Sequence, residues 1–175
     1  MSDKRSQGKK ILNLYGYTGS ATVHALMKNA ISTTTVDISE AHLQRARANI
    51  PLNGFGGPQH ITVEKDCIEW LERCREQFAL IFVDPPTFST NRNRKISFSI
   101  KDDHEKLLQL CMQRLSLDGV LIFSTSFRNF SMADSLQRYF DVQEITSAMI
   151  PEDFKNSPQT RRCWELRPLS DTEEL

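Results

Sequence analysis

Three aspartates stand where short apolar or β-branched stretches of the sequence end, and carboxylates in that position can bind a ligand. Asp37 closes one such stretch, Asp66 follows one that ends at Glu64, and Asp84 follows the continuous apolar run 78–83. If these stretches are neighbouring parallel strands, their carboxyl ends meet at one edge of a sheet. There a carboxylate can accept hydrogen bonds from ribose hydroxyls or from the exocyclic amine of a base. Asp37 and Asp66 could instead cap the helices that follow them, and both roles can hold together.

The stretch 9–20 is predicted to form a strand, a tight turn and the start of a helix. The apolar residues 11–14 stop at a turn that contains Gly16 and Gly19. Such a turn presents backbone N–H groups and a helix N-terminus to a ligand. With Asp37 at the end of the next strand, it indicates a site for a cofactor that contains adenosine. NAD and S-adenosylmethionine both remain open at this point, although the turn has one glycine fewer than a dinucleotide loop.

The turn Asp84-Pro85-Pro86-Thr87-Phe88 narrows the class of enzyme. Its two prolines fix φ and remove two backbone donors, so the turn is stiff and its carbonyl groups are free to face a ligand. Phe88 offers a flat apolar face on which a base could stack, worth roughly 1–3 kcal/mol. Enzymes that methylate flipped-out bases have a use for such a turn, and NAD enzymes have none. The candidate catalytic residues are therefore Asp84, Pro85, Pro86 and Phe88; the alternative is a rigid structural turn with Phe88 in the core.

Residues 13–25, 33–37 and 82–89 together resemble one family. They are similar to the guanine-N7 methyltransferase domain of the bacterial bifunctional 23S rRNA methyltransferase RlmK/L, a class I S-adenosylmethionine-dependent methyltransferase. The likeness extends over residues 10–166. It implies S-adenosyl-L-methionine as the cofactor and a guanine of 23S rRNA, in the large ribosomal subunit or its precursor, as the substrate. The chain is shorter than those enzymes, so we expect a second methyltransferase or RNA-binding domain to be missing from it.

Three base chemistries fit the Pro-Pro turn. Cytosine C5 needs a cysteine thiolate, which in the related 5-methylcytosine enzymes follows the fifth strand, whereas here residues 123–127 hold no cysteine. Guanine N2 needs a proton acceptor, for which Asp84 and the Pro85 carbonyl are available. Guanine N7 already holds an in-plane lone pair and needs only alignment with the methyl group. We expect guanine N7, with guanine N2 and then cytosine C5 as alternatives; an inactive domain that binds RNA or a partner is a further alternative.

The expected cofactor site combines the glycine turn with the strand ends. Asn13 and Thr18 are expected to contact the methionine end of the cofactor, and Asp37 its ribose. The full set is Asn13, Tyr15, Gly16, Thr18, Gly19, Asp37, Ile38, Ser39, Asp66, Cys67 and Asp84. Basic residues in the loop after the Pro-Pro turn, joined by later ones, form a candidate patch for RNA phosphates. Its members are Arg92, Arg94, Lys95, Arg128, Lys155 and Arg161.

The composition limits which partners and which cellular compartment the protein can have. Among 175 residues, 22 Lys and Arg balance 22 Asp and Glu, so RNA contact must come from local patches. The four cysteines include no Cys-x-x-Cys pair, which fits free thiols in a reducing compartment. No apolar run approaches the roughly 18 residues of a membrane helix, and no apolar region follows the charged N-terminus as in a secretory signal. We therefore expect a cytoplasmic protein, and the histidine spacing predicts no metal.

These candidate residues need a sheet to bring them together. Strands are predicted at 11–14, 33–36, 60–64, 78–83, 120–123, 142–146 and 163–166, helices at 20–30, 39–50, 67–75, 102–115 and 131–140, and a polar loop at 87–99. The alternation is the βαβ pattern of an α/β, Rossmann-like doubly wound sheet, mostly parallel with an antiparallel edge strand. We expect one methyltransferase domain at 10–168, between a flexible N-terminus at 1–9 and an acidic tail at 169–175.

Overall fold

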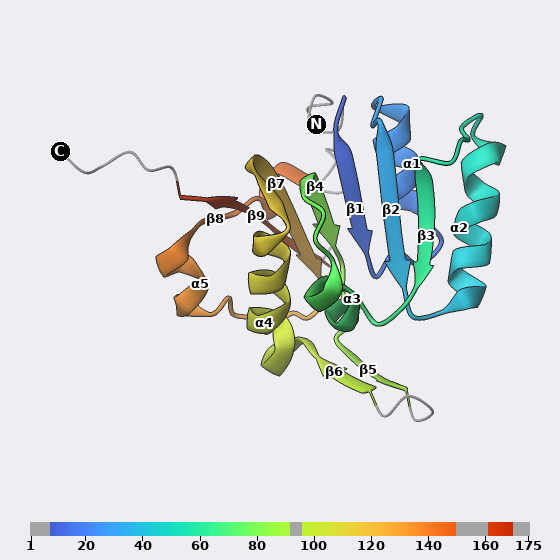
Figure 1. The fold of residues 1–175 in the computed structure, drawn as a ribbon. Coiled ribbons are helices and arrows are strands. Elements are labelled where there is room, and N and C mark those ends of the chain that lie inside the picture. The colour runs from blue at the N-terminus through green and yellow to red at the C-terminus, as the bar shows by residue number, and fades with distance from the viewer. Residues whose placement is uncertain (1–7, 92–95, 150–160, 170–175) are drawn as a thin grey trace.

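The computed structural model describes residues 8–91, 96–149 and 161–169, and a seven-stranded sheet runs through them (Figure 1). In spatial order the strands are β3 (His60–Glu64), β2 (Ser32–Asp37), β1 (Lys10–Leu14), β4 (Phe78–Val83), β7 (Leu115–Thr125), β9 (Arg162–Pro168) and β8 (Phe140–Glu144). The first five run parallel. Strand β9 is antiparallel to both of its neighbours, β7 and β8. The predicted fold class, a mostly parallel sheet with antiparallel pairing at one edge, is confirmed.

Helices cover both faces of this sheet. They are α1 (Ser20–Met27), α2 (Glu40–Leu52), α3 (Cys67–Arg73), α4 (Ile100–Gln113), α5 (Asp134–Tyr139) and the short α6 (Thr146–Met149). Helices α1 and α2 contact each other, and α4 contacts both α3 and α5. In Figure 1, α3 and α4 lie in front of the strands and α1 lies behind them. This doubly wound arrangement follows from right-handed crossovers between parallel strands.

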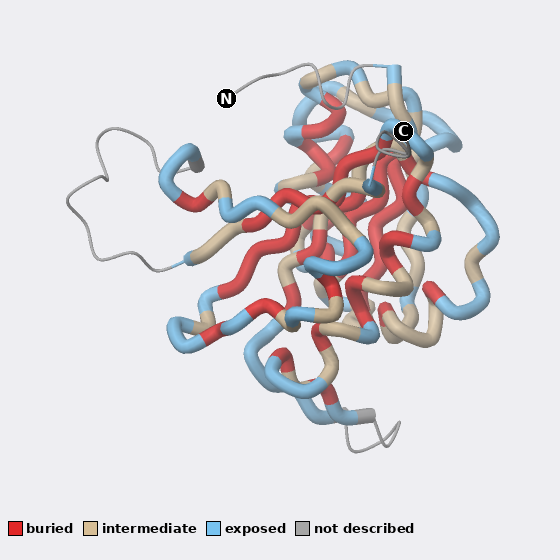
Figure 2. The backbone as a smooth tube through the Cα atoms, turned by 90° about the vertical axis from the view of Figure 1, so that its left-hand side faces the viewer, coloured by how far each residue is buried: buried red, intermediate tan, exposed pale blue. Residues whose placement is uncertain are grey.

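The core is centred on the strands that are covered on both faces. Leu12, Ile81 and Leu121, from β1, β4 and β7, are fully buried. Figure 2 shows the buried residues concentrated in the middle of the molecule. Parallel strands are covered by helices on both sides, so their sequences are continuous apolar runs rather than alternating patterns. This is why the run at Phe78–Val83 could be assigned correctly as β4 from the sequence.

The prediction of a polar loop at 87–99 is wrong in part. It contains two antiparallel strands, β5 (Phe88–Asn91) and β6 (Ile96–Ser99), which pair Ser89 with Phe98. Phe98 is 3% exposed and its ring lies 5.5 Å from that of Tyr15. The buried Phe98 side chain thus fixes this pair against the sheet. In the sequence, Phe88, Ile96 and Phe98 are spread through a polar segment, which is too weak a pattern to identify two strands.

Helix α4 begins two residues earlier than predicted because its first turn is capped by its own carboxylates. Asp103 Oδ2 accepts the Ser99 backbone N–H at 2.8 Å, and Asp102 Oδ2 accepts the Ser99 hydroxyl at 2.7 Å. Negative charge in the first turn is favourable because the helix dipole is positive there. Strand β7 is longer than predicted at both ends, and α6 was not predicted. The termini predicted as flexible fall mostly outside the described residues.

Candidate functional site

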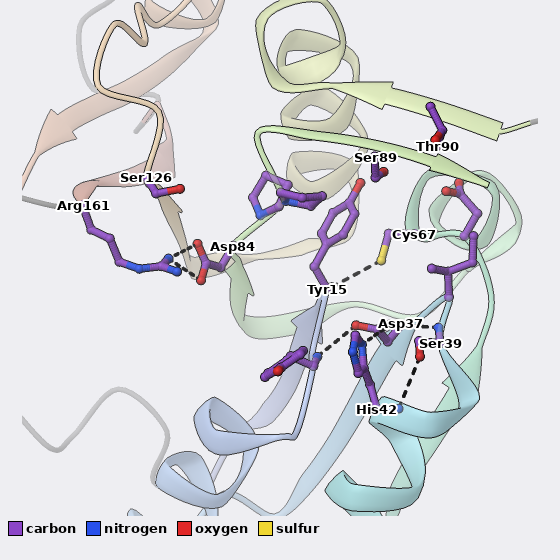
Figure 3. Close-up of a pocket in the computed structure, with 15 residues that line it drawn as sticks. Tyr15, Asp37, Ser39, His42, Cys67, Asp84, Ser89, Thr90, Ser126 and Arg161 are labelled. Atoms are coloured by element: carbon purple, nitrogen blue, oxygen red, sulfur yellow. Dashed lines mark hydrogen bonds and ion pairs between the residues drawn. The ribbon is translucent and has the colours of Figure 1, made fainter. Parts of the chain in front are cut away.

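The carboxyl ends of the parallel strands meet at one edge of the sheet. The register pairs Leu14 with both Val36 and Val83, and Val83 with Phe123. The residues that follow these strands therefore come together, and they line a pocket of about 500 Å³ (Figure 3). Its lining residues are Tyr15, Tyr17, Asp37, Ile38, Ser39, His42, Asp66, Cys67, Asp84, Pro85, Pro86, Ser89, Thr90, Ser126 and Arg161. A crevice outside the carboxyl ends of the strands is where open α/β sheets bind ligands.

The turn after β1 is held by close backbone packing. Tyr15 and Tyr17 both have positive φ, 53° and 48°, and the Gly16 N–H donates to the Val36 carbonyl at 3.0 Å. A Cβ on Gly16 would come within 2.3 Å of Thr35. Gly16 is therefore needed because the turn presses against β2, and the same close packing turns the two tyrosines toward the pocket.

Four residues predicted to bind the cofactor do not line the pocket: Asn13, Gly16, Thr18 and Gly19. Asn13 is 3% exposed, and its amide donates to the Thr22 hydroxyl at 3.0 Å, which in turn lies 2.7 Å from the hydroxyl of Thr35. This chain of buried polar groups joins β1, α1 and β2. The Asn13 side chain thus faces the interior, because the outward positions of the turn begin only after Leu14, and its predicted contact with a ligand stays a prediction.

Three groups contact the Asp37 carboxylate, one from the turn after β1 and two from the start of α2. Its Oδ2 accepts the Tyr17 N–H at 2.9 Å, and its Oδ1 accepts the Ser39 N–H at 2.9 Å. His42 Nδ1 lies 3.3 Å from Oδ1, and the His42 ring packs edge-on against Tyr17 with centroids 4.3 Å apart. Asp37 is only 7% exposed. Two backbone donors therefore fix the direction of this carboxylate.

Asp66 and Cys67 form the next part of the wall. Asp66 Oδ1 accepts the Glu69 N–H at 2.9 Å, so the residue caps α3 while it lines the pocket. The Tyr15 N–H donates to Cys67 Sγ at 3.3 Å, and the thiol faces the Val36 carbonyl at 3.7 Å. Burial raises the pKa of the Cys67 thiol and of the Tyr15 phenol. Both groups are therefore uncharged at neutral pH.

The Asp84-Pro85-Pro86 turn forms the opposite side of the pocket. Pro85 is buried and Pro86 is exposed. Arg161 Nη1 donates to both carboxylate oxygens of Asp84 and lies 3.4 Å from the Ser124 hydroxyl (Figure 3). The Asp84 side chain is 25% exposed and that of Arg161 is 53% exposed. This ion pair places one positive and one negative group side by side at the pocket wall.

Arg161 reaches the pocket because β9 runs antiparallel to β7. The register pairs Thr125 with Arg162, so the residue before β9 lies beside the carboxyl end of β7. Arg162 itself points elsewhere: it forms an ion pair with Glu144 and its guanidinium carbon lies 4.6 Å from the centre of the Trp164 ring. Of two adjacent arginines, only the first belongs to the pocket.

Phe88 is 64% exposed and does not line the pocket, although its neighbours Ser89 and Thr90 do. The alternative that Phe88 sits in the core is therefore wrong. In Figure 3 the Tyr15 ring points toward Ser89, and the buried Tyr15 hydroxyl has no hydrogen-bond partner among the described residues. The Phe88 ring is exposed beside the pocket, and its stacking against a base stays a prediction.

The predicted RNA-binding residues are only partly covered by the structure. Arg92, Arg94, Lys95 and Lys155 lie outside the described residues. Arg128 is exposed, and Arg161 is paired with Asp84.

Five lining residues were not predicted: Tyr17, His42, Ser89, Thr90 and Ser126. His42 carried a usable signal, since it lies in the first turn of the helix that follows Asp37. Ser126 was missed because the predicted strand stops at Phe123, whereas β7 continues to Thr125. The sequence held no such signal for Ser89 and Thr90, because their position at the pocket depends on the pairing of β5 with β6.

Within residues 8–91, 96–149 and 161–169, no group of three or more His, Cys, Asp or Glu side chains could hold a metal ion. Across the same part of the chain, no helix is long and apolar enough to span a membrane.

Known proteins resemble this chain along most of its length. A protein of Desulfotalea psychrophila named Ribosomal RNA large subunit methyltransferase K/L is 51% identical over 164 residues, which are 94% of this chain and 23% of that protein. The protein of the same name from Pseudomonas aeruginosa is 44% identical over 163 residues, 93% of this chain and 22% of its own. The chain thus spans about a quarter of the length of these relatives. The resemblance to the K/L rRNA methyltransferases is confirmed.

Solved structures share the fold. SMU.776, which was crystallised in complex with SAH, superimposes with a TM-score of 0.75 and 25% identity, over 94% of this chain and 46% of its own. A SAM-dependent methyltransferase from Agrobacterium tumefaciens gives a TM-score of 0.75 with 20% identity, over 95% of this chain and 58% of its own. The sheet is therefore of the class I methyltransferase type. A family model described as Conserved hypothetical protein 95 matches residues 1–123, and the chain belongs to that family.

Proposed function

We propose that this chain is a domain that transfers a methyl group from S-adenosyl-L-methionine to a base of 23S rRNA, at guanine N7. The observation that carries the proposal is the convergence of Asp37, Asp66 and the Asp84-Pro85-Pro86 turn on one pocket. The names of the relatives, which are rRNA methyltransferases, support the same substrate class.

The residues of the pocket fit an adenosine-containing cofactor. A carboxylate offers about four acceptor positions, and Asp37 uses two on backbone N–H groups and a third on His42. It can therefore still accept from a ribose hydroxyl. Ile38 and Cys67 supply apolar wall for an adenine ring, and Asp66, with one oxygen engaged by α3, can accept from its amine. The volume of about 500 Å³ lies within the usual range for cofactor sites.

When bound, S-adenosylmethionine supplies an electrophilic methyl group on a sulfonium. The protein's part is to hold the target base in line with it, which is catalysis by proximity and orientation. Asp84, Pro85 and Pro86 border the space for that base, and no proton has to leave guanine N7. Methylation at N7 makes the base cationic, so the Asp84 carboxylate stabilises the product once Arg161 shifts toward an RNA phosphate.

The thiols of the pocket region argue against methylation of cytosine C5. That reaction needs a thiolate. Cys67 lines the pocket, but burial raises its pKa and its sulfur is engaged by the Tyr15 N–H. Burial also raises the pKa of Cys163. Neither group is set up as a nucleophile at neutral pH.

We further propose that the domain works in the cytoplasm together with a second methyltransferase or RNA-binding domain. Arg128 is exposed for phosphate contact, and the relatives are about four times longer than this chain. If basic residues bind RNA phosphates, the affinity for a 23S fragment must fall steeply as salt is raised. An affinity that is independent of salt would exclude the phosphate patch.

The deciding experiment is methylation of unmodified 23S rRNA with labelled cofactor, followed by nucleoside analysis. We expect 7-methylguanosine. N2-methylguanosine or 5-methylcytidine would overturn the N7 assignment. If no label is transferred and calorimetry detects no binding of S-adenosylmethionine, the domain is an inactive binding module.

A further inference from the structure

A second pocket has a volume of about 460 Å³. Its lining residues are Lys101, Phe127, Asn129, Phe130 and Ser131. The two pockets are linked through the chain at two points. Ser126 lines the first and Phe127 the second, and the Ile100 N–H donates to the carbonyl of Thr87, directly after the Pro-Pro turn, at 3.1 Å. Both pockets are therefore lined in part by the segment that follows the carboxyl end of β7.

The floor of the second pocket is rigid. Phe130 is 4% exposed, its ring lies 4.9 Å from His104 and 5.1 Å from Trp164, and its carbonyl accepts from Arg162 at 2.7 Å. The loop above it is tied at its start, where the Phe127 N–H donates to the Thr125 hydroxyl at 3.0 Å. The shape is thus largely formed before any ligand arrives, which reduces the entropic cost of binding.

Two positively charged residues belong to the segments that form this pocket: Lys101 lines it, and Arg128 stands between the lining residues Phe127 and Asn129. Lys101 and Arg128, which follows Phe127 in the loop, are exposed, and within the described part of the chain no hydrogen bond or ion pair involves either charged group. The nearest carboxylates along the chain, Asp102 and Asp103, are directed to Ser99 at the helix start. An anionic ligand would therefore meet two available cations with little local repulsion.

We propose that the second pocket binds the nucleotide adjacent to the target base on a single RNA strand. Phe127 provides an apolar ring for stacking, Asn129 and Ser131 provide hydrogen-bonding groups for base or sugar, and Lys101 and Arg128 contact the phosphate that joins the two nucleotides. Extrusion of a base leaves its neighbours unstacked, and a stacking surface beside the target pocket compensates for that loss. The identity of the ligand as RNA rests on the proposed function; the pocket and its charges do not.

The test compares two probes: a fluorescein-labelled RNA pentanucleotide with a central guanosine, and guanosine 5′-monophosphate. Lys101→Ala, an exposed position that should leave the fold intact, is expected to weaken pentanucleotide binding about fivefold. Phe127→Leu, which keeps apolar volume but removes the aromatic ring, is expected to weaken it about tenfold. Neither change should alter the affinity for S-adenosylhomocysteine. Arg45→Ala, which removes one positive charge from the exposed side of α2, is the matched control and should bind the pentanucleotide like the unchanged protein.

Failure of the inference and failure of the proposed function are distinguishable. If the unchanged protein binds S-adenosylhomocysteine but Lys101→Ala and Phe127→Leu bind the pentanucleotide normally, the second pocket is not a nucleotide subsite and the methyltransferase proposal is untouched. If S-adenosylhomocysteine does not bind but the pentanucleotide still depends on Lys101 and Phe127, the subsite is supported and the methyltransferase proposal fails. A pentanucleotide that binds no more tightly than the mononucleotide also overturns the inference.

Discussion

Arg161 donates to both carboxylate oxygens of Asp84, a residue 77 positions earlier in the chain. The pair joins the Pro-Pro turn after β4 to the start of β9, and it lies at the pocket wall. Since Asp84 is the expected catalytic carboxylate and Arg161 an expected RNA contact, each partner holds the other in the absence of substrate. Binding of an RNA phosphate by Arg161 would free Asp84 for the base.

This ion pair should contribute little to stability. Both side chains are partly exposed, 53% for Arg161 and 25% for Asp84, and such pairs are worth about 0.2–1 kcal/mol because solvent screens them. In a double-mutant cycle with Arg161→Gln and Asp84→Asn, urea denaturation should give a coupling free energy in that range. A coupling above about 2 kcal/mol would mean that the pair is structural rather than exchangeable.

The charge of Asp84 should matter for turnover. Asp84→Asn keeps the shape of the side chain but removes the negative charge that would stabilise a cationic product, and kcat for methyl transfer should fall about 100-fold. Asp118→Asn makes the same chemical change at an exposed position near the amino end of β7 and should leave kcat unchanged. Equal activity of the two variants would remove Asp84 from the catalytic step.

Asp37 should be more important for the cofactor than its neighbour His42. Asp37→Asn loses the charge that two backbone N–H groups hold in place, and the affinity for S-adenosylhomocysteine should fall by about tenfold or more. His42→Ala leaves both backbone hydrogen bonds intact, so its affinity should change by less than about threefold. Calorimetry on both variants measures this directly; a larger loss for His42→Ala would show that the imidazole, not the carboxylate, contacts the ligand.

A comparison of Gly19 with Gly54 separates the free-energy cost of close packing from the cost of a left-handed backbone conformation. Their φ values are 78° and 79°, but a Cβ on Gly19 would lie 2.9 Å from that of Ala46, whereas Gly54 has nothing within 4 Å. Gly54→Ala should therefore lower the free energy of unfolding by about 1 kcal/mol, the cost of a left-handed conformation. Gly19→Ala should cost about 1–3 kcal/mol more, because α1 and α2 must separate. Equal losses in chemical denaturation would mean that α2 shifts freely.

The protein should lose stability in alkaline solution through its buried thiols. Cys111 is fully buried, and burial raises the pKa of its thiol above the value of about 8.5 in the unfolded chain. Above that pH the unfolded thiol loses its proton while the folded one keeps it, so the free energy of unfolding falls as pH rises, by about 1.4 kcal/mol per pH unit for one thiol. Below pH 8 the contribution is constant. Denaturation of Cys111→Ala between pH 9 and 10 should show a slope smaller by that amount; an unchanged slope would mean that Cys111 ionises in the folded protein.

Much of the site could be read from the sequence because it depends on local patterns. Continuous apolar runs identified the parallel strands, and the aspartates at their ends had to meet at one edge whatever the details of packing. Asp37, Asp66 and Asp84 therefore line the pocket as the pattern indicated. The same reasoning placed Ser39 and Cys67, since each lies within two residues of such an aspartate.

What the sequence could not decide depends on how distant segments pack. Asn13 looks like a ligand contact in one dimension, yet its side chain turns inward to Thr22 because the adjacent β2 is lined with threonines that need polar partners. Arg161 and Arg162 are equivalent by type, and only the antiparallel register of β9 sends the first to Asp84 and the second to Glu144. Strand ends are local properties of the chain, whereas the direction of a side chain at a buried turn, and the partner of a charge, are set by tertiary contacts.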